Sequence, residues 1–449
     1  MVDSLWGDDF VVKSEPKEVK KIVKKISQPK DPTKVVEKQV KSKSLTIKEK
    51  LAIITENVYK ILGRYAEDTL VIKTKEELVN YIDTAIKNGV IAVDTETNNS
   101  LDPITCKLMG TCLYTPGLKN AYIPHNHVDV DTGIRLDWQL TEQDIFEQFS
   151  RLGDTKIITH NGKFDYQVIK CTTGYQMKVY WDSFIGAKML DENERQHGLK
   201  PQYIEKIDPS IEKYSIDHLF EGVEYAVVKP EVFALYAATD SYMTYKLYLW
   251  QKEQFEMVGH ERLFDVFMNI EMPVMEVAAE MELSGVCIDT EYSKRLSDKY
   301  HKKLDDLDEV IAEELSKYNE EIRKWRLTDE ANYHPPKTRG EGFGKSKNEL
   351  LEDPINLASP VQLAILLYDI LKVPAVDKKQ PRGTGEDIIV KIKLPICKLI
   401  LERRGLVKLL STYIDKFTEI INPKTGRLHA HFLQLGAGTG RFSSNDPNL

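Results

Sequence analysis

The sequence predicts an α/β domain followed by a mainly α-helical region. In the first part, short apolar stretches of strand length alternate with segments whose apolar residues recur every three or four positions. After about Arg262 the strand-like stretches stop and the helical spacing continues. Successive strands first and helices later are typical of a mixed sheet flanked by helices. The 449 residues are enough for two or three domains, each with its own core.

The elements of the first domain follow from these two periodicities. A helix at about 45–65 leads into the domain. Strands are expected at 89–95, 108–114, 121–124 and 156–159. Helices are expected at 74–87, 141–152, 164–171, 183–190 and 230–255. We therefore place this domain at 46–262.

The second domain, at 263–449, is expected to be mainly helical. Apolar residues repeat at helical spacing from Tyr292 to Tyr318, which predicts one long amphipathic helix with Asp289 as a plausible cap. A polar stretch at 327–353 interrupts the helices. Shorter helices are expected at 360–371 and 386–417.

Residues 1–45 are expected to form a disordered, lysine-rich tail. Between Val11 and Lys50 there are 13 lysines against five acidic residues, and such a composition favours a solvated segment. Two sharper interpretations stay open. The tail could tether the protein weakly to DNA, or Leu5, Trp6 and Phe10 could form a docking peptide.

Composition excludes some classes of protein. The five cysteines form no C-x-x-C pair and show no metal-ligand spacing, which favours a reduced, cytoplasmic protein over a disulfide-rich one. No apolar run approaches the ~20 residues needed to span a bilayer. The net charge of −8 does not argue against nucleic-acid binding, because phosphate contact needs only a local basic stripe.

Carboxylates follow two of the predicted strands. Asp94 and Glu96 sit at the end of an apolar strand, where positions i and i+2 point the same way. Asp165 comes directly after another apolar strand, in the run His160-Asn161-Gly162-Lys163-Phe164-Asp165. Taken alone, the first pair could be an exposed strand end, and Asp165 could be a helix cap.

A third pattern lies on a predicted helix. Tyr236 and Asp240 are spaced i, i+4, which places both on one face, although such a pair alone could be a core edge and a solvated acid. Combined with Asp94, Glu96 and Asp165, the pattern supplies four hard oxygen ligands, which suit Mg²⁺ or Mn²⁺ rather than zinc. Two such ions ~3.5–4 Å apart can clamp a phosphodiester. The combination therefore favours a two-metal nuclease.

These motifs resemble those of the DEDD exonucleases with tyrosine in the third motif, which have a ribonuclease H-like fold. The resemblance covers about 70–251. It implies that Asp94, Glu96, Asp165 and Asp240 hold two metal ions, Mg²⁺ with Mn²⁺ as a substitute. It also implies that Tyr236 orients the attacking water, a task that Glu96 could share. The likeness further places Leu101 against the terminal base and Asn161 near the substrate strand.

The helical half resembles the thumb and the start of the palm of family A DNA polymerases of the DNA polymerase I type, in a phage-like form. Four segments in order carry this resemblance, at 272–289, 356–363, 401–413 and 439–449. The last, Thr-Gly-Arg-Phe-Ser-Ser-Asn-Asp-Pro-Asn-Leu, is the most specific. It implies that Arg441 reaches the minor groove near the primer terminus. The same set separates this chain from ribonuclease D, which shares the exonuclease motifs.

The resemblance also implies partners. The family's palm and fingers continue beyond a segment like 447–449, so we expect a second polypeptide or exon product to supply them, and no polymerisation by this chain alone. We also expect the last segment to be a strand or loop without its sheet. Single-stranded and primer–template DNA are the expected substrates. Candidate phosphate contacts are Lys337, Arg339, Lys345, Lys347, Lys378, Lys379 and Arg382.

Three functions are therefore weighed. The first is the N-terminal portion of a family A polymerase in DNA replication, with a proofreading 3′–5′ exonuclease on this chain. The second is a stand-alone DEDD exonuclease in repair or RNA processing, which the four polymerase-like segments disfavour. The third is a non-catalytic DNA-binding subunit, which the presence of all five motif residues disfavours.

Overall fold

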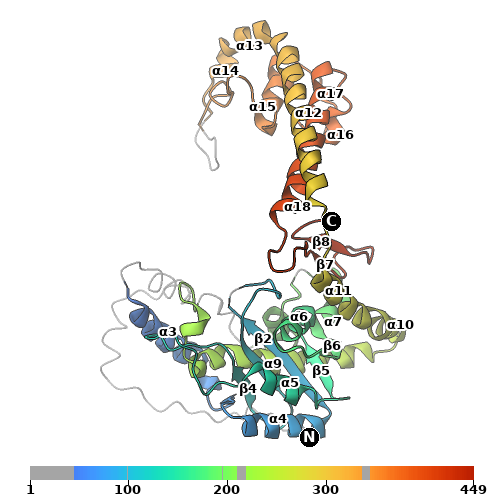
Figure 1. Cartoon of the computed structure of the whole chain (residues 1–449). Coiled ribbons are helices and arrows are strands. Elements are labelled where there is room, and N and C mark those ends of the chain that lie inside the picture. Colours follow the sequence, from blue (N-terminus) through green and yellow to red (C-terminus); the bar gives the residue numbers. More distant parts are fainter. Residues whose placement is uncertain (1–44, 99, 195, 210–218, 336–343) are drawn as a thin grey trace. The chain divides into compact units, whose positions relative to one another are not determined.

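The computed structural model describes residues 45–98, 100–194, 196–209, 219–335 and 344–449, so nearly all of the predicted tail lies outside it. The chain divides into two compact units. The first comprises the chain up to Leu283 together with Gln434–Phe442, and the second comprises Ser284–Leu433 and Ser443–Leu449. Figure 1 labels their elements. In the described ranges, no helix is both long and apolar enough to cross a bilayer.

The first unit is built on a mixed sheet, as the sequence predicts. Its described residues form six strands in the order β1-β4-β3-β2-β5-β6. β3 is antiparallel to both neighbours, whereas β1 is parallel to β4 and β2, β5 and β6 are mutually parallel. The strands are β1 Thr69–Val71, β2 Val90–Thr97, β3 Leu108–Tyr114, β4 Asn120–Pro124, β5 Lys156–Thr159 and β6 Val179–Asp182.

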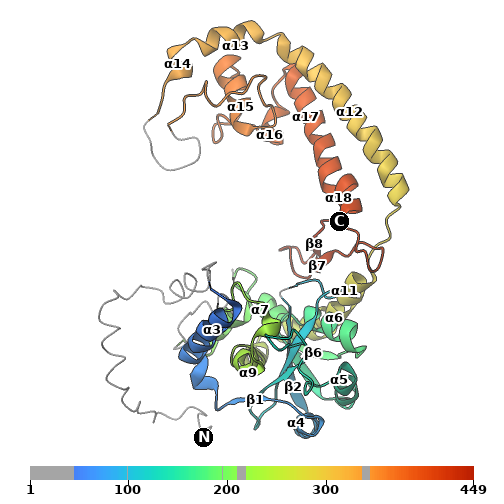
Figure 2. The same ribbon diagram turned by 60° about the vertical axis from the view of Figure 1, so that its left-hand side comes forward.

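Helices cover both faces of this sheet. α9 crosses one face and contacts β1 to β5, while α4 and α6 pack against the other and α5 lies between them. Figure 2 shows α9 and α5 on opposite sides of the strands. The bounds of these helices are α4 Lys75–Asn88, α5 Glu142–Phe149, α6 Gly162–Thr173 and α9 Pro230–Phe255.

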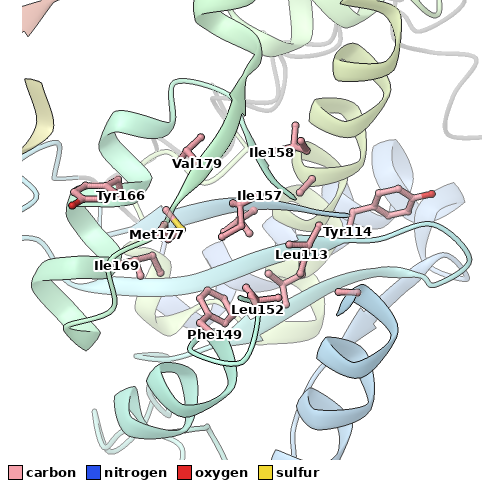
Figure 3. Close-up of a cluster of buried hydrophobic side chains, with 14 of the residues drawn as sticks. Leu113, Tyr114, Phe149, Leu152, Ile157, Ile158, Tyr166, Ile169, Met177 and Val179 are labelled. Atoms are coloured by element: carbon pink, nitrogen blue, oxygen red, sulfur yellow. The ribbon is translucent and has the colours of Figure 1, made fainter. Parts of the chain in front are cut away.

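The core between the sheet and its helices is apolar and closed. Leu113 from β3 and Ile157 from β5 meet Phe149 of α5 and Ile169 of α6, and each of these side chains is almost completely buried (Figure 3). Close packing of this kind resists movement of the backbone. The strand ends therefore offer fixed positions for polar side chains.

Shorter helices complete the first unit. α3 begins with a capping box at Thr46 and packs against α9. α11 carries Glu282, which accepts a hydrogen bond from Gln167 of α6 at 2.7 Å. The remaining bounds are α3 Ile47–Leu62, η1 Gly63–Tyr65, α7 Ser183–Leu190, α8 Leu199–Lys206, η3 Tyr225–Val227, α10 Glu261–Val266, η4 Phe267–Glu271 and α11 Met272–Ser284.

The second unit is mainly helical, as the sequence predicts, with a core of its own. α12 lies along α17, which both views show (Figures 1 and 2). Asp289 caps α12 through the Tyr292 N–H at 2.8 Å, which confirms the predicted cap. The helices are α12 Thr290–Ser316, α13 Asn319–Arg326, α14 Asp329–Asn332, α15 Pro360–Ala364, η5 Ile365–Ile370, α16 Glu386–Ile389, α17 Pro395–Leu409, η6 Leu410–Ile414 and α18 Asp415–Glu419.

Three expectations for this unit are corrected. The helix at 386–417 is divided because Pro395 lacks an N–H and therefore starts a new helix, α17. The helix at 360–371 changes to π-helix at Ile365. The last segment is not without a sheet, since β8 Ser443–Asn445 pairs antiparallel with β7 His431–Leu433.

Candidate functional site

β2 positions the first two predicted carboxylates. Its apolar residues Ile91, Ala92 and Val93 are fully buried, and the strand emerges from the core at Asp94. Asp94 lies opposite Cys112 of β3, and Glu96 lies opposite Gly110. Directly opposed residues of an antiparallel pair point to the same face. Ligand atoms of Asp94, Glu96 and Cys112 accordingly all lie within 4.8 Å of one another.

Asp165 is tied to the same strand. Its Oδ1 accepts hydrogen bonds from the backbone N–H of Thr95 at 2.9 Å and from the Thr95 hydroxyl at 2.6 Å. The side chain is only 3% exposed. The N-cap residue of helix α6 is Asn161, so Asp165 is not the helix cap that the sequence left open. The carboxylate is instead bonded to Thr95, the residue between Asp94 and Glu96 in the sequence.

The turn before α6 depends on a residue that the sequence analysis missed. Buried Asp182 accepts hydrogen bonds from the N–H groups of Asn161 at 3.1 Å and Gly162 at 2.7 Å. Asn161 has a positive φ of 60°, and a Cβ at Gly162 would lie 2.0 Å from Thr159 Oγ1. Asp182 also caps α7, and a cap was the only signal that the sequence could have given.

Tyr236 and Asp240 lie one turn apart on α9, where the sequence predicts them. The Tyr236 ring packs against Phe220 with 5.3 Å between centroids. The ammonium of Lys200 on α8 lies 4.7 Å from the Tyr236 ring centroid and 3.2 Å from Asp240 Oδ2. No sequence motif pointed to Lys200, because its contact with α9 depends on the tertiary fold.

The four predicted carboxylates influence one another's ionisation, although among the described residues only Asp94 and Glu96 of the four belong to a group whose ligand atoms all lie within 4.8 Å of one another. Burial, followed by the charges of Asp165, Glu96 and Asp240, raises the pKa of Asp94 well above its ordinary value. Burial and then the charge of Asp240 raise the pKa of Glu96 to about 8. Burial is also the main cause that raises the pKa of Asp165 to about 7. Mutual repulsion between buried carboxylates requires short separations.

This donor set fits a divalent cation. Carboxylate oxygens are the ligands that Mg²⁺ and Mn²⁺ prefer. A bound cation would remove the repulsion that raises these pKa values, because it adds positive charge where negative charge accumulates. The thiol of Cys112 does not suit these ions, because burial and the charge of Asp94 raise its pKa. We therefore assign the metal-binding potential to the carboxylates.

The predicted DNA contacts have different outcomes. Leu101 is 78% exposed, as a residue that packs on a base requires. Arg441, Lys378 and Lys379 are exposed, the last two in the second unit. Lys337 and Arg339 lie outside the described residues. The roles of all these residues remain predictions.

Two other candidate phosphate contacts have a partner within the protein. Lys347 Nζ lies 2.8 Å from Asp369 Oδ1, and Arg382 makes a bidentate pair with the same carboxylate. Asp369 is only 4% exposed, so its two cations satisfy a buried charge. Lys345 is exposed. We therefore interpret Lys347 and Arg382 as structural residues of the second unit.

Comparison with known families gives two matches along the chain. Residues 69–254 match the model of 3′-5′ exonucleases, and residues 337–449 match the model of DNA polymerase family A. The chain carries a 3′–5′ exonuclease domain and a segment of a family A DNA polymerase. The family expected from the sequence motifs is thus confirmed. The expectation of a phage-like form stays a prediction.

Several bacterial DNA polymerases are similar to this chain. The DNA polymerase I of Borreliella burgdorferi is 27% identical over 84% of this chain, and that of Treponema pallidum is 28% identical over 83%. The thermostable DNA polymerase I of Thermus aquaticus is 34% identical over 42% of this chain. The chain spans 37% of the length of the first two relatives and 19% of the third.

A solved structure shows the same fold. It is described as the POL domain of Pol1 from M. smegmatis in complex with DNA primer-template and dNTP. The TM-score is 0.61 at 18% identity, and the match covers 85% of this chain and 55% of that one. The exonuclease domain followed by a helical region, as expected from the sequence, is confirmed.

Proposed function

We propose that this chain hydrolyses the 3′-terminal phosphodiester of DNA as the proofreading exonuclease of a family A DNA polymerase. The observation that supports the proposal is the pair Asp94 and Glu96 on β2, with Asp165 hydrogen-bonded to Thr95 and with Asp240 close enough for its charge to raise the pKa values of the pair. These residues lie within a segment that matches the exonuclease family. The setting would be DNA replication in the cytoplasm, or the host cytoplasm for a viral protein.

Each residue of the site has a proposed task. The four carboxylates, two on β2, one on α6 and one on α9, would hold two Mg²⁺ ions, for which Mn²⁺ can substitute. When bound, the ions supply an activated water and neutralise the leaving oxygen. The Tyr236 hydroxyl, with Glu96, would orient that water. Leu101 and Asn161 would contact the terminal nucleotide and its strand.

The first test is digestion of a 5′-labelled single-stranded DNA by the purified chain with Mg²⁺. We expect a ladder that shortens from the 3′ end and disappears in Asp94→Ala, because this variant loses a carboxylate of the site. Asp83→Ala is the matched control. Asp83 is an exposed acid of α4 that pairs with Arg151, so its loss changes the charge equally without touching the site. Cleavage that persists in Asp94→Ala would exclude the proposed mechanism.

The substrate separates the proposal from its alternatives. A proofreading nuclease should remove a mismatched primer 3′ terminus faster than a paired one, because the unpaired end enters the site without melting a base pair. A stand-alone repair or RNA-processing enzyme should show no such preference, or should favour RNA. A non-catalytic subunit should bind DNA without cutting it. Palm and fingers from a second polypeptide or exon product remain a prediction, and primer extension by the chain with and without that partner tests it.

A further inference from the structure

A lysine lies among the residues proposed to hold metal. Lys200, near the start of α8, places its ammonium 3.2 Å from Asp240 Oδ2 and 4.7 Å from the ring centroid of Tyr236. Its side chain is 26% exposed and that of Asp240 is 15% exposed. The pair is therefore partly shielded from water. An ion pair in such a position is stronger than one at the surface.

The influence of this ammonium extends beyond Asp240. The positive charge of Lys200 lowers the pKa of Asp94 and of Glu96, against the larger opposite effect of burial. Lys200 thus offsets part of the repulsion within the carboxylate cluster. A divalent cation among the same oxygens would offset that repulsion more strongly, because it carries two charges.

We propose that Lys200 is a built-in counter-cation, which pairs with Asp240 in the metal-free protein and competes with divalent metal for that carboxylate. The inference rests on the proposed function, because it takes Asp240 as a metal ligand. Lysine suits the role, since its ammonium is a point charge on a flexible stem and can turn away when a metal binds. Lys200 is in this sense a positioning residue, which keeps Asp240 in place until metal arrives.

Two opposite effects follow from removing the charge. Lys200→Met should bind metal more tightly, because the competing cation is gone. The same variant should be less stable in the absence of metal, because four carboxylates then face one another with less compensation. A residue that only filled space would not produce the first effect.

Lys206 offers a matched control on the same helix. Its ammonium pairs with Glu205 at 2.7 Å and Glu194 at 3.7 Å, and it lies 6.0 Å from the Trp250 ring centroid. Like Lys200, it is a partly exposed lysine of α8 that pairs with acids and lies near an aromatic ring. Its partners are not among the carboxylates of the site. Lys206→Met therefore makes the same chemical change without the proposed competition.

The experiment is calorimetric titration of the whole chain with Mn²⁺ in the absence of DNA, together with thermal melting in EDTA and in Mn²⁺. We expect Lys200→Met to lower the dissociation constant for Mn²⁺ by about threefold to tenfold, as loss of one nearby charge allows. The melting temperature in EDTA should fall, and the rise on adding Mn²⁺ should be larger than in the wild type. Lys200→Arg keeps the charge and should bind Mn²⁺ nearly as the wild type does, as should Lys206→Met.

Each outcome has a defined meaning. Equal Mn²⁺ affinity in the wild type and Lys200→Met, or weaker affinity in the variant, would overturn the inference. If Lys200→Met does not fold, Asp240→Asn and Asp240→Asn with Lys200→Met replace it, because loss of Asp240 relieves the repulsion. The inference then expects the Mn²⁺ affinities of these two variants to differ by less than about threefold, because only the weaker effect of Lys200 on Asp94 and Glu96 remains, and a difference of about tenfold or more would overturn it. A wild-type chain that binds no Mn²⁺ would instead overturn the proposed function.

Discussion

The buried carboxyl groups of Glu96 on β2 and Asp165 on α6 ionise less readily than free carboxyl groups in the metal-free protein. The pKa of Glu96 rises to about 8 from 4.5 and that of Asp165 to about 7 from 3.8, mainly through burial. A carboxyl with a raised pKa keeps its proton in the folded chain at pH values where the unfolded chain has lost it. The free energy of unfolding without metal should therefore fall by several kcal/mol as pH rises from about 4 to about 8.

Thermal melting from pH 4 to 9 in EDTA and in Mg²⁺ checks this prediction. Bound Mg²⁺ stabilises the ionised carboxylates, so the loss of stability with rising pH should be much smaller in Mg²⁺ than in EDTA. Glu96→Gln removes one titrating group and should flatten the profile in EDTA. Identical profiles with and without Mg²⁺ would show that these carboxylates do not bind the ion.

The sequence predicts those members of the site that belong to short local patterns. Asp94 with Glu96 and Tyr236 with Asp240 are recognisable because strand and helix periodicities place each pair on one face. Cys112, Asp182 and Lys200 could not be predicted in this way. Cys112 depends on the register of β2 with β3, and Asp182 and Lys200 contact residues on other elements. Spacing along the chain carries no information on such contacts.

Among elements, the packing of α11 on α6 depends on a buried charge. Lys163 Nζ lies 2.6 Å from Glu282 Oε1, and Gln167 Nε2 donates to Glu282 Oε2 at 2.7 Å. The Glu282 side chain is only 4% exposed. Glu282→Ala leaves the Lys163 ammonium without this partner in a shielded place. We expect a loss of about 2–4 kcal/mol in stability, measured by urea unfolding.

Lys163→Met with Glu282→Leu tests the reason for that loss. Replacing both charges by apolar side chains should restore much of the stability, because no charge is then left buried without its partner. Glu320→Ala, which breaks an exposed pair with Lys324 at 3.8 Å, should change stability by less than about 1 kcal/mol. A double variant no more stable than Glu282→Ala would show that packing, not charge, causes the loss.

Helices and strands were predictable where their apolar pattern extends over many residues or has clear ends. The strands at 108–114 and 156–159 and the helices at 183–190 and 230–255 have the predicted bounds. β1 was missed because three residues are too short to show a period, and β6 was missed although β5 has the same length of four residues. The π-helical turns η5 and η6 were missed because their apolar residues fit an α-helix equally well.

For the whole molecule, the two units have separate apolar cores, and this separation predicts two unfolding steps. One core includes Phe149, Trp181 and Phe267, and the other includes Trp325, Leu363 and Ile400. The change of sequence pattern indicated the two cores. It could not indicate that Gln434–Phe442 groups with the first unit, because the return of a distant segment leaves no periodic signal.

Calorimetry should resolve the two steps and assign them. Mg²⁺ should raise the melting temperature of the first unit alone, because a ligand stabilises the fold that binds it. Arg382→Met should lower the other transition by about 5–10 °C, since buried Asp369 loses its bidentate partner. Exonuclease activity on single-stranded DNA should not change in this variant. If one cooperative transition responded to both changes, the two cores would unfold as a single unit, and stability measured for either would describe the whole chain.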